Sequence, residues 1–335
     1  MKQTIILPYL GYGTRRRVRL CGRVLADEGL RPARDGDRRW RNLVAFYRRL
    51  ESDEVPGAGL RALLHNRSTE TATDREGYFS LELTRLALKP GWHDVQVVLL
   101  RKPAVAAIGR VLVPSERARF GVISDIDDTV VHSNVGNKIR MVLALALSNA
   151  RTRKPFNGVA AFYRALHAGV NPVFYVSKSP WNLYAPLVEF LAHQGLPAGP
   201  LALRDFGLRM RKNHKTEAIE AILRTYPKLP FVLIGDSGEQ DPEIYADVVR
   251  RFPGRIRAVY IRSVDPNRIS AVYDLVAQIA PTGTQLVLAP DSESAAAHAA
   301  AEGLIQPSDL RGIRSDRRSD ESSRSKPAAS SGALQ

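Results

Sequence analysis

Residues 121–129 read Gly-Val-Ile-Ser-Asp-Ile-Asp-Asp-Thr, an apolar run that ends in carboxylates and a hydroxyl. A short apolar run bounded in this way is typical of a buried strand of a parallel sheet. Ligands of such sheets bind beyond the carboxyl ends of the strands. Asp125 and Asp127 are therefore expected where chemistry takes place.

The chain around this stretch repeats one pattern over residues 120–283. Short apolar runs alternate with amphipathic helical patterns, which indicates βαβ units and a parallel sheet. We therefore expect an α/β fold, a Rossmann-like three-layer domain, over residues 120–290. Its strands are expected at 120–126, 172–177, 200–204, 231–235 and 256–261. Its helices are expected at 158–167, 181–193, 215–225, 242–251 and 267–279.

The two ends of the chain differ from this middle part. Residues 1–119 hold strand-like runs separated by turn residues, and they predict a smaller β-rich, sandwich-like domain. Within it, residues 40–50 repeat apolar side chains at helical spacing and predict one helix. Residues 291–335 are rich in Ser, Ala, Arg and Asp. Because such a composition buries little apolar surface, we expect a flexible, disordered tail there.

Composition limits the class of protein. The 335 residues correspond to about two domains, and 44% of them are hydrophobic, enough for a substantial core. The single cysteine, Cys21, excludes an intramolecular disulfide and a clustered cysteine zinc site. No apolar run approaches a membrane span and no signal peptide is evident, so we expect a cytoplasmic protein. The net charge of +15 favours anionic partners: nucleic acid, an anionic membrane surface or a phosphorylated substrate.

Polar side chains also lie at the ends of two further apolar runs and at the start of one amphipathic helix. Ser177 ends the second expected strand of the α/β region, and Lys215 begins an amphipathic helix. Asp236 and Asp241 follow the strand at 231–235. Clustered carboxylates hold Mg²⁺, and the metal offsets both their mutual repulsion and the charge of a phosphate. Together these residues favour metal-assisted phosphoryl transfer.

In this order the residues resemble the four motifs of the haloacid dehalogenase superfamily of phosphatases. The runs at 125–129, 175–184, 214–219 and 235–245 resemble one branch of it, the actin-patch-associated type of Mg²⁺-dependent phosphatidate phosphatase. Lys178 departs from the pattern, because a small residue is expected between the two serines of the second run.

The resemblance implies a role for each matching side chain. Asp125 would be the nucleophile that forms an aspartyl-phosphate. Asp127 would protonate the leaving oxygen and then activate the hydrolytic water. Thr129, Ser177 and Lys215 would bind the phosphoryl group, with the lysine acting as a point charge.

The resemblance also implies the metal site. Mg²⁺ would be held by the carboxylates of Asp125 and Asp236 and by the backbone carbonyl of Asp127, and Asp241 would complete or support its shell. Mg²⁺ is the cofactor that this arrangement predicts.

Residues 137–154 follow the first motif and combine an apolar run with basic flanks. They fit either a helix buried against the domain core or a surface that meets acyl chains while the basic residues hold lipid phosphate. The 52-residue interval from Asp125 to Ser177 leaves no room for a large cap domain there, so the site is expected to be open to a bulky substrate.

The function expected from the sequence is Mg²⁺-dependent hydrolysis of phosphatidate to diacylglycerol and phosphate, with peripheral contact to an anionic membrane. One alternative is a phosphomonoesterase acting on another substrate, such as nucleic-acid ends. Nucleic acid is the less favoured partner, because basic and aromatic residues do not interleave as a stacking platform. A second alternative is a binding module without catalysis.

Overall fold

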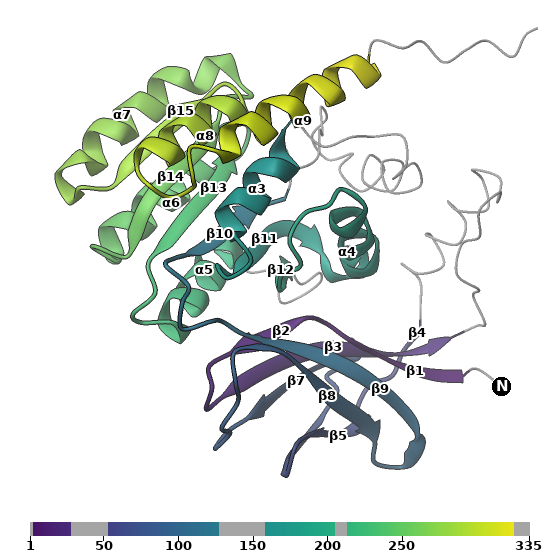
Figure 1. Ribbon diagram of the computed structural model, residues 1–335. Coiled ribbons are helices and arrows are strands. Elements are labelled where there is room, and N and C mark those ends of the chain that lie inside the picture. Colours follow the sequence, from purple (N-terminus) through teal and green to yellow (C-terminus); the bar gives the residue numbers. More distant parts are fainter. Residues whose placement is uncertain (1–2, 28–52, 127–157, 205–212, 325–335) are drawn as a thin grey trace, which may run out of the picture.

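The structure of the protein is a computed structural model, and it describes residues 3–27, 53–126, 158–204 and 213–324 (Figure 1). Several sequence predictions lie outside these residues. They are the helix at 40–50, the site residues Asp127 and Thr129, and the segment 137–154.

The N-terminal part is a β domain, drawn at the bottom of Figure 1. Its strands lie in one sheet with the order β1-β3-β2-β9-β8-β5-β6, and β4 and β7 both pair with β3. Neighbours run antiparallel except β2 and β9, which are parallel. The strands are β1 (Gln3–Pro8), β2 (Gly11–Gly13), β3 (Val18–Asp27), β4 (Asp53–Glu54), β5 (Gly59–Leu64), β6 (Arg67–Ala72), β7 (Tyr78–Leu83), β8 (Gly91–Leu99) and β9 (Lys102–Val113).

Alternating side chains give this domain its core. Leu60, Ala62 and Leu64 of β5 point inward, as do Phe79 and Leu81 of β7. Residues between them in these strands are half-buried or exposed. A period of two with one buried face is the pattern expected for strands that cover a single apolar interior. The prediction of a β-rich N-terminal region is confirmed.

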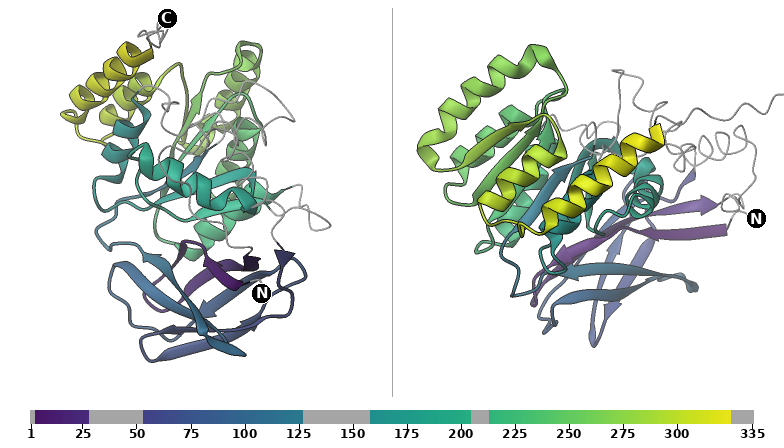
Figure 2. Two further views of the ribbon diagram at one scale, coloured as in Figure 1. Left: turned by 90° about the vertical axis from the view of Figure 1, so that its right-hand side faces the viewer. Right: turned by 45° about the horizontal axis from the view of Figure 1, so that its top comes forward.

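The C-terminal part is built on a six-stranded, entirely parallel sheet with the order β12-β11-β10-β13-β14-β15 (Figures 1 and 2). All residues of β10 and β13 are buried, as expected for central strands that helices cover on both faces. The five strands predicted here are confirmed, and β15 is an addition. The strands are β10 (Gly121–Asp125), β11 (Val173–Pro180), β12 (Leu201–Arg204), β13 (Phe231–Asp236), β14 (Ile256–Arg262) and β15 (Gln285–Ala289).

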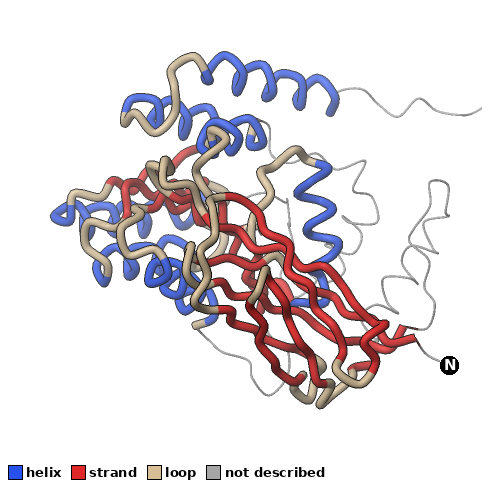
Figure 3. Tube along the Cα trace, turned by 60° about the horizontal axis from the view of Figure 1, so that its bottom comes forward, coloured by secondary structure: helices blue, strands red, loops and turns tan. Residues whose placement is uncertain are grey.

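Helices cover both faces of this sheet and make three layers. One apolar cluster packs α3 (Val159–His167), α4 (Tyr184–His193), α8 (Ser292–Ala301) and α9 (Asp309–Arg324) against one face. A second cluster packs α5 (His214–Thr225), α6 (Asp241–Arg251) and α7 (Ile269–Ile279) against the other. The predicted α/β class is therefore confirmed. Figure 3 shows the strands of both domains and the helices that flank the parallel sheet.

The expectation of a flexible tail from residue 291 is wrong for residues 292–324, which form α8 and α9. Helix α9 is polar, but Ile313 is buried in the core and the Asp316 carboxylate accepts a hydrogen bond from the Ala161 backbone N–H. Arg314 and Arg317 of α9 pair with Glu293 of α8 at 2.7 and 3.1 Å. These long-range contacts stabilise a helix whose own composition predicts disorder. No helix of the described residues is long and apolar enough to cross a membrane.

Candidate active site

Three neighbouring strands bring the predicted site residues to one edge of the parallel sheet. Asp125 is the last residue of β10, which lies between β11 with Ser177 and β13 with Asp236 as its last residue. Lys215 lies in the first turn of α5, and Asp241 is the first residue of α6. All five side chains are buried. The carboxyl edge of the sheet therefore gathers residues of three strands and of two helix N-termini, as its topology requires.

Lys215 lies at the centre of this group. Its Nζ atom is 2.9 Å from the Asp125 carboxylate and forms a second, very short ion pair with Asp241. The carboxylate of Glu239 lies 3.6 Å from the same Nζ atom. Burial alone lowers the pKa of Lys215, but the carboxylates of Asp125 and Asp241 outweigh it and raise the pKa well above its usual value. The lysine is therefore charged at neutral pH.

Glu239 is a member of the group that the sequence analysis did not single out. Its carboxylate also pairs with Lys178, at 3.0 Å from that Nζ atom, so it bridges two lysines. Its side chain is 16% exposed and that of Lys178 is 34% exposed. The residue stands inside the Gly-Asp-x-x-x-x-Asp run, and only the turn geometry of that run brings it to the site. Lys178, the departure from the family pattern, is thus part of the site's charge balance.

The turn after β13 holds Asp236 and Asp241 in fixed positions. The Asp236 Oδ1 atom accepts hydrogen bonds from the backbone N–H groups of Gly238, at 2.6 Å, and Glu239, at 3.2 Å. A Cβ at Gly235 would collide with the Asp241 carboxylate and would lie 2.8 Å from a ring carbon of Tyr245. The glycine is therefore needed for the close approach of β13 to the start of α6.

Carboxylate oxygens suit a divalent cation, although the three that lie closest together are the ones that surround the Lys215 ammonium. Among the described residues, Asp125, Glu239 and Asp241 each offer a carboxylate oxygen, and these oxygens lie within 4.8 Å of one another. Oxygen-only ligands of this kind suit Mg²⁺. Asp236 is not in that trio, and its assignment as a ligand stays a prediction. Asp127 lies outside the described residues.

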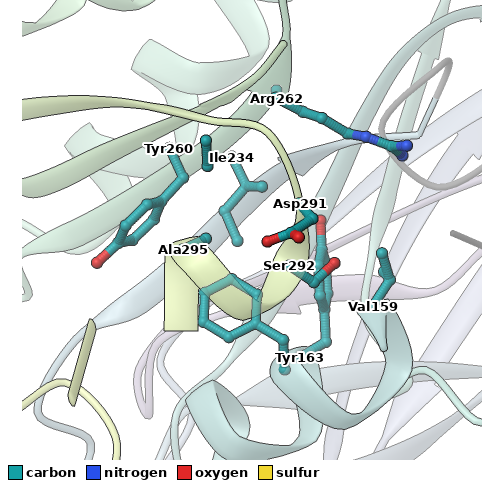
Figure 4. A pocket seen from close by; sticks show the side chains of 11 residues that line it. Val159, Tyr163, Ile234, Tyr260, Arg262, Asp291, Ser292 and Ala295 are labelled. Atoms are coloured by element: carbon teal, nitrogen blue, oxygen red, sulfur yellow. The ribbon is translucent and has the colours of Figure 1, made fainter. Parts of the chain in front are cut away.

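A pocket lies beside the site, on the face of the sheet that carries α3 and α8 (Figure 4). Ser124, which precedes Asp125, shares a 2.6 Å hydrogen bond with the hydroxyl of Tyr163 in its wall. In Figure 4 the Arg262 side chain reaches outward from the end of β14, and Asp291 comes from the start of α8. The remaining lining is mainly apolar.

Comparison with known proteins gives a consistent result for this part of the chain. Residues 120–263 match the family described as phosphatidate phosphatase APP1, catalytic domain. The phosphatidate phosphatase APP1 of Saccharomyces cerevisiae is 35% identical over 152 residues, which is 43% of this chain and 26% of that protein. An uncharacterized protein of Schizosaccharomyces pombe is 30% identical over 206 residues, 58% of this chain and 34% of that protein. The chain thus spans about a quarter to a third of the length of these curated relatives.

Solved structures show more distant similarity. A HAD family hydrolase from Deinococcus radiodurans has a TM-score of 0.35 and 19% identity, and the match covers 57% of this chain and 99% of that one. A phosphoserine phosphatase from T. onnurineus has a TM-score of 0.30 and 13% identity, with 54% and 94% covered.

Proposed function

We propose, from the match of residues 120–263 to the family described as phosphatidate phosphatase APP1, catalytic domain, that the chain is a Mg²⁺-dependent phosphatidate phosphatase. The observation that carries the proposal is the buried group of Asp125, Lys215 and Asp241 at the carboxyl edge of the parallel sheet. A buried cation between carboxylates provides the charge that a phosphoryl group requires.

In the proposed reaction a carboxylate oxygen of Asp125 attacks phosphorus, and the ester bond to the glycerol oxygen breaks. Asp127 donates its proton to that oxygen, and diacylglycerol leaves. Asp127 then takes a proton from water, which attacks the phosphorus of the aspartyl-phosphate and releases phosphate and the Asp125 carboxylate. Lys215, Ser177 and Thr129 bind the phosphoryl oxygens throughout.

The proposed cofactor is Mg²⁺, held by Asp125 with Asp236, the Asp127 carbonyl and Asp241 as predicted, or with Glu239 and Asp241 as the carboxylate trio suggests. When bound, it supplies positive charge that offsets the carboxylates and the phosphate.

The test compares three substrates: phosphatidate vesicles, a 5′-phosphorylated oligonucleotide and a soluble phosphomonoester, each with and without Mg²⁺. We expect hydrolysis of phosphatidate to be the fastest, to need Mg²⁺, and to be lost in Asp125→Asn, since an amide of equal size is a poor nucleophile. Faster turnover of the oligonucleotide would reject the lipid substrate. Undiminished activity of Asp125→Asn would reject the nucleophile.

Contact with an anionic membrane is the further part of this proposal, and it rests on the basic residues Arg151, Arg153 and Lys154 of the sequence. Each basic residue near an anionic surface contributes about 1 kcal/mol, and salt screens this contribution. Replacing all three with Gln is expected to lower activity on phosphatidate vesicles at low salt and to leave a soluble monoester unaffected. Equal losses on both substrates would reject the membrane contact.

A further inference from the structure

The β domain contacts the catalytic domain a few residues after Ser177, the predicted phosphate-binding residue. Tyr9 stacks on Trp181 with ring centroids 4.5 Å apart and planes 8° apart, and it also packs on Tyr184 at 4.3 Å. The backbone N–H of Leu10 donates a 2.6 Å hydrogen bond to the Tyr184 hydroxyl. The chain from Ser177 to Tyr184 is called here the phosphate segment. The aromatic rings at its C-terminal end therefore pack against the β domain.

Arg23 of β3 provides the polar part of the same contact. Its guanidinium lies 4.6 Å from the centre of the Tyr78 ring, and it donates 2.9 Å hydrogen bonds to the Glu76 carbonyl and to the Glu54 carboxylate. Its remaining terminal nitrogen donates a 2.9 Å hydrogen bond across the boundary to the side-chain oxygen of Asn182. Arg23 is only 6% exposed. Three contacts within the β domain hold the buried guanidinium in place. It is therefore a rigid hydrogen-bond donor to Asn182 of the other domain.

A second contact reaches the helix that carries Lys215. The hydroxyl of Tyr226, the residue after α5, donates a 3.1 Å hydrogen bond to the carbonyl of Gly13. The Tyr12 ring meets Phe174 of β11 edge-on, at 5.4 Å. The β domain thus contacts both parts of the chain that carry predicted phosphate-binding residues. It contacts the phosphate segment, which begins with Ser177, and the C-terminal end of α5, whose first turn holds Lys215.

We propose that Arg23 is a positioning residue: through Asn182 it fixes the phosphate segment, so that the β domain sets the affinity of the site for a phosphoryl group. This inference rests on the proposed function. Asn182 is separated from Ser177 by four residues, and the intervening chain is a strand followed by a single 3-10 turn, Trp181–Leu183. Because phosphate binding depends on sub-ångström placement, a shift of this turn is expected to reach Ser177 and Lys178.

The alternative is that the contact only joins the two domains. It would then contribute to the free energy of unfolding and to the fraction of folded enzyme, and it would leave the affinity of folded molecules for phosphate unchanged. The two readings separate when inhibition by inorganic phosphate is measured, since an inactive fraction lowers the maximal rate and leaves the inhibition constant unaltered.

The experiment uses Asn182→Leu, which removes the acceptor and keeps the size, and Asn182→Asp, which keeps the acceptor. Both are compared with Arg23→Gln and with Arg61→Gln, a matched control that breaks an arginine–glutamate pair of 2.7 Å with Glu70 inside the β domain. The assay measures hydrolysis of a soluble phosphomonoester by the whole chain, with inorganic phosphate as competitive inhibitor. It is run at a temperature well below the melting temperature of every variant.

We expect the inhibition constant for phosphate to rise about three- to tenfold in Asn182→Leu and Arg23→Gln, less than the full loss of a charge-assisted hydrogen bond, because the contact acts on phosphate only through the position of the phosphate segment. Asn182→Asp and Arg61→Gln are expected to stay within about twofold of the wild type. The double variant of Arg23 and Asn182 is expected to be no worse than Asn182→Leu alone, because that change already removes the oxygen that accepts from both Arg23 and the Tyr78 hydroxyl.

Two results would overturn the inference. One is an unchanged inhibition constant in Asn182→Leu together with a lower melting temperature; the other is additive effects in the double variant. If Arg23→Gln does not fold, the two Asn182 variants still distinguish positioning of the phosphate segment from a contact that only joins the domains. If the wild-type chain hydrolyses no phosphomonoester, the proposed function fails, and calorimetric titration with phosphate then tests the positioning separately.

Discussion

Replacing Lys215 with Met tests how far one buried cation holds the site together. The side chain is 2% exposed and pairs with two fully buried carboxylates, those of Asp125 and Asp241. Removing one partner of a buried ion pair costs about 3–5 kcal/mol. A domain of this size loses about 2–4 °C of melting temperature per kcal/mol. The expected decrease is therefore about 6–20 °C at pH 7.

The change of stability with pH provides a second, independent test of this prediction. Burial already raises the pKa of Asp241 in the wild type although the charge of Lys215 lowers it, so the loss of Lys215 raises that pKa further above its value in the unfolded chain. An acid with a raised folded-state pKa destabilises the fold at high pH, and the penalty is relieved as pH falls. In the wild type, Lys215 has a raised pKa, so its contribution is complete at neutral pH and is lost only at alkaline pH. The gap between variant and wild type should therefore narrow from pH 7 towards pH 5.

The assay is thermal unfolding followed by circular dichroism, with Lys228→Met as the control because Lys228 is exposed. The control is expected to melt with the wild type. Turnover of any phosphomonoester should fall by more than about 100-fold in Lys215→Met, since in the proposed reaction this cation also binds the phosphoryl group. A Lys215→Met protein that melts within about 1 °C of the wild type, or a gap that widens at low pH, would refute the reasoning.

Three further changes test other parts of the structure. Gly235→Ala places a methyl group against the Asp241 carboxylate, so activity should fall more than about tenfold with a lower melting temperature; wild-type activity would contradict the steric argument. Asp236→Ala should raise the Mg²⁺ concentration needed for half-maximal activity, measured by titration, and an unchanged requirement would remove Asp236 from the metal site. Hydrogen bonds from Ser294 and the charge of Arg317 overcome burial and lower the pKa of Asp291, so its charge stabilises the fold above pH 3.8 and this effect is lost as pH falls further. Asp291→Asn, which keeps the helix cap, should therefore melt further below the wild type at pH 7 than at pH 3; an equal difference at both values would contradict this.

The parallel sheet is the part of the fold that sequence patterns predict best. Its strands are continuous apolar runs, such as 231–235, because both faces are covered, and each run ends at a residue that cannot continue the pattern. The same rule places Asp125 and Asp236 at the functional edge. Helix α5 is equally readable, since Ile219, Ile222 and Leu223 follow helical spacing.

What the sequence could not show depends on contacts between distant residues. Glu239 has the spacing of an ordinary turn residue, and it joins the site because Asp236 accepts the backbone N–H of the same turn. Lys178 has no local sign of a partner until Glu239 is brought beside it. Helix α9 reads as a tail because its stabilising contacts are ion pairs to α8 and one buried side chain, Ile313. The positional roles of these residues follow from tertiary structure, which local patterns do not contain.

The position of α9 against α3 has a consequence for how the protein is made. The β domain is complete once Val113 has been synthesised, whereas the apolar cluster on α3 includes Ile313, which follows 200 residues later. At ribosomal rates of about 5–20 residues per second, this interval lasts about 10–40 s. Until α9 has been made, the apolar residues that Ile313 covers stay exposed, while the finished β domain already presents Tyr9 and Arg23 to the emerging phosphate segment. Closure of the catalytic domain therefore waits for the last helix to leave the ribosome.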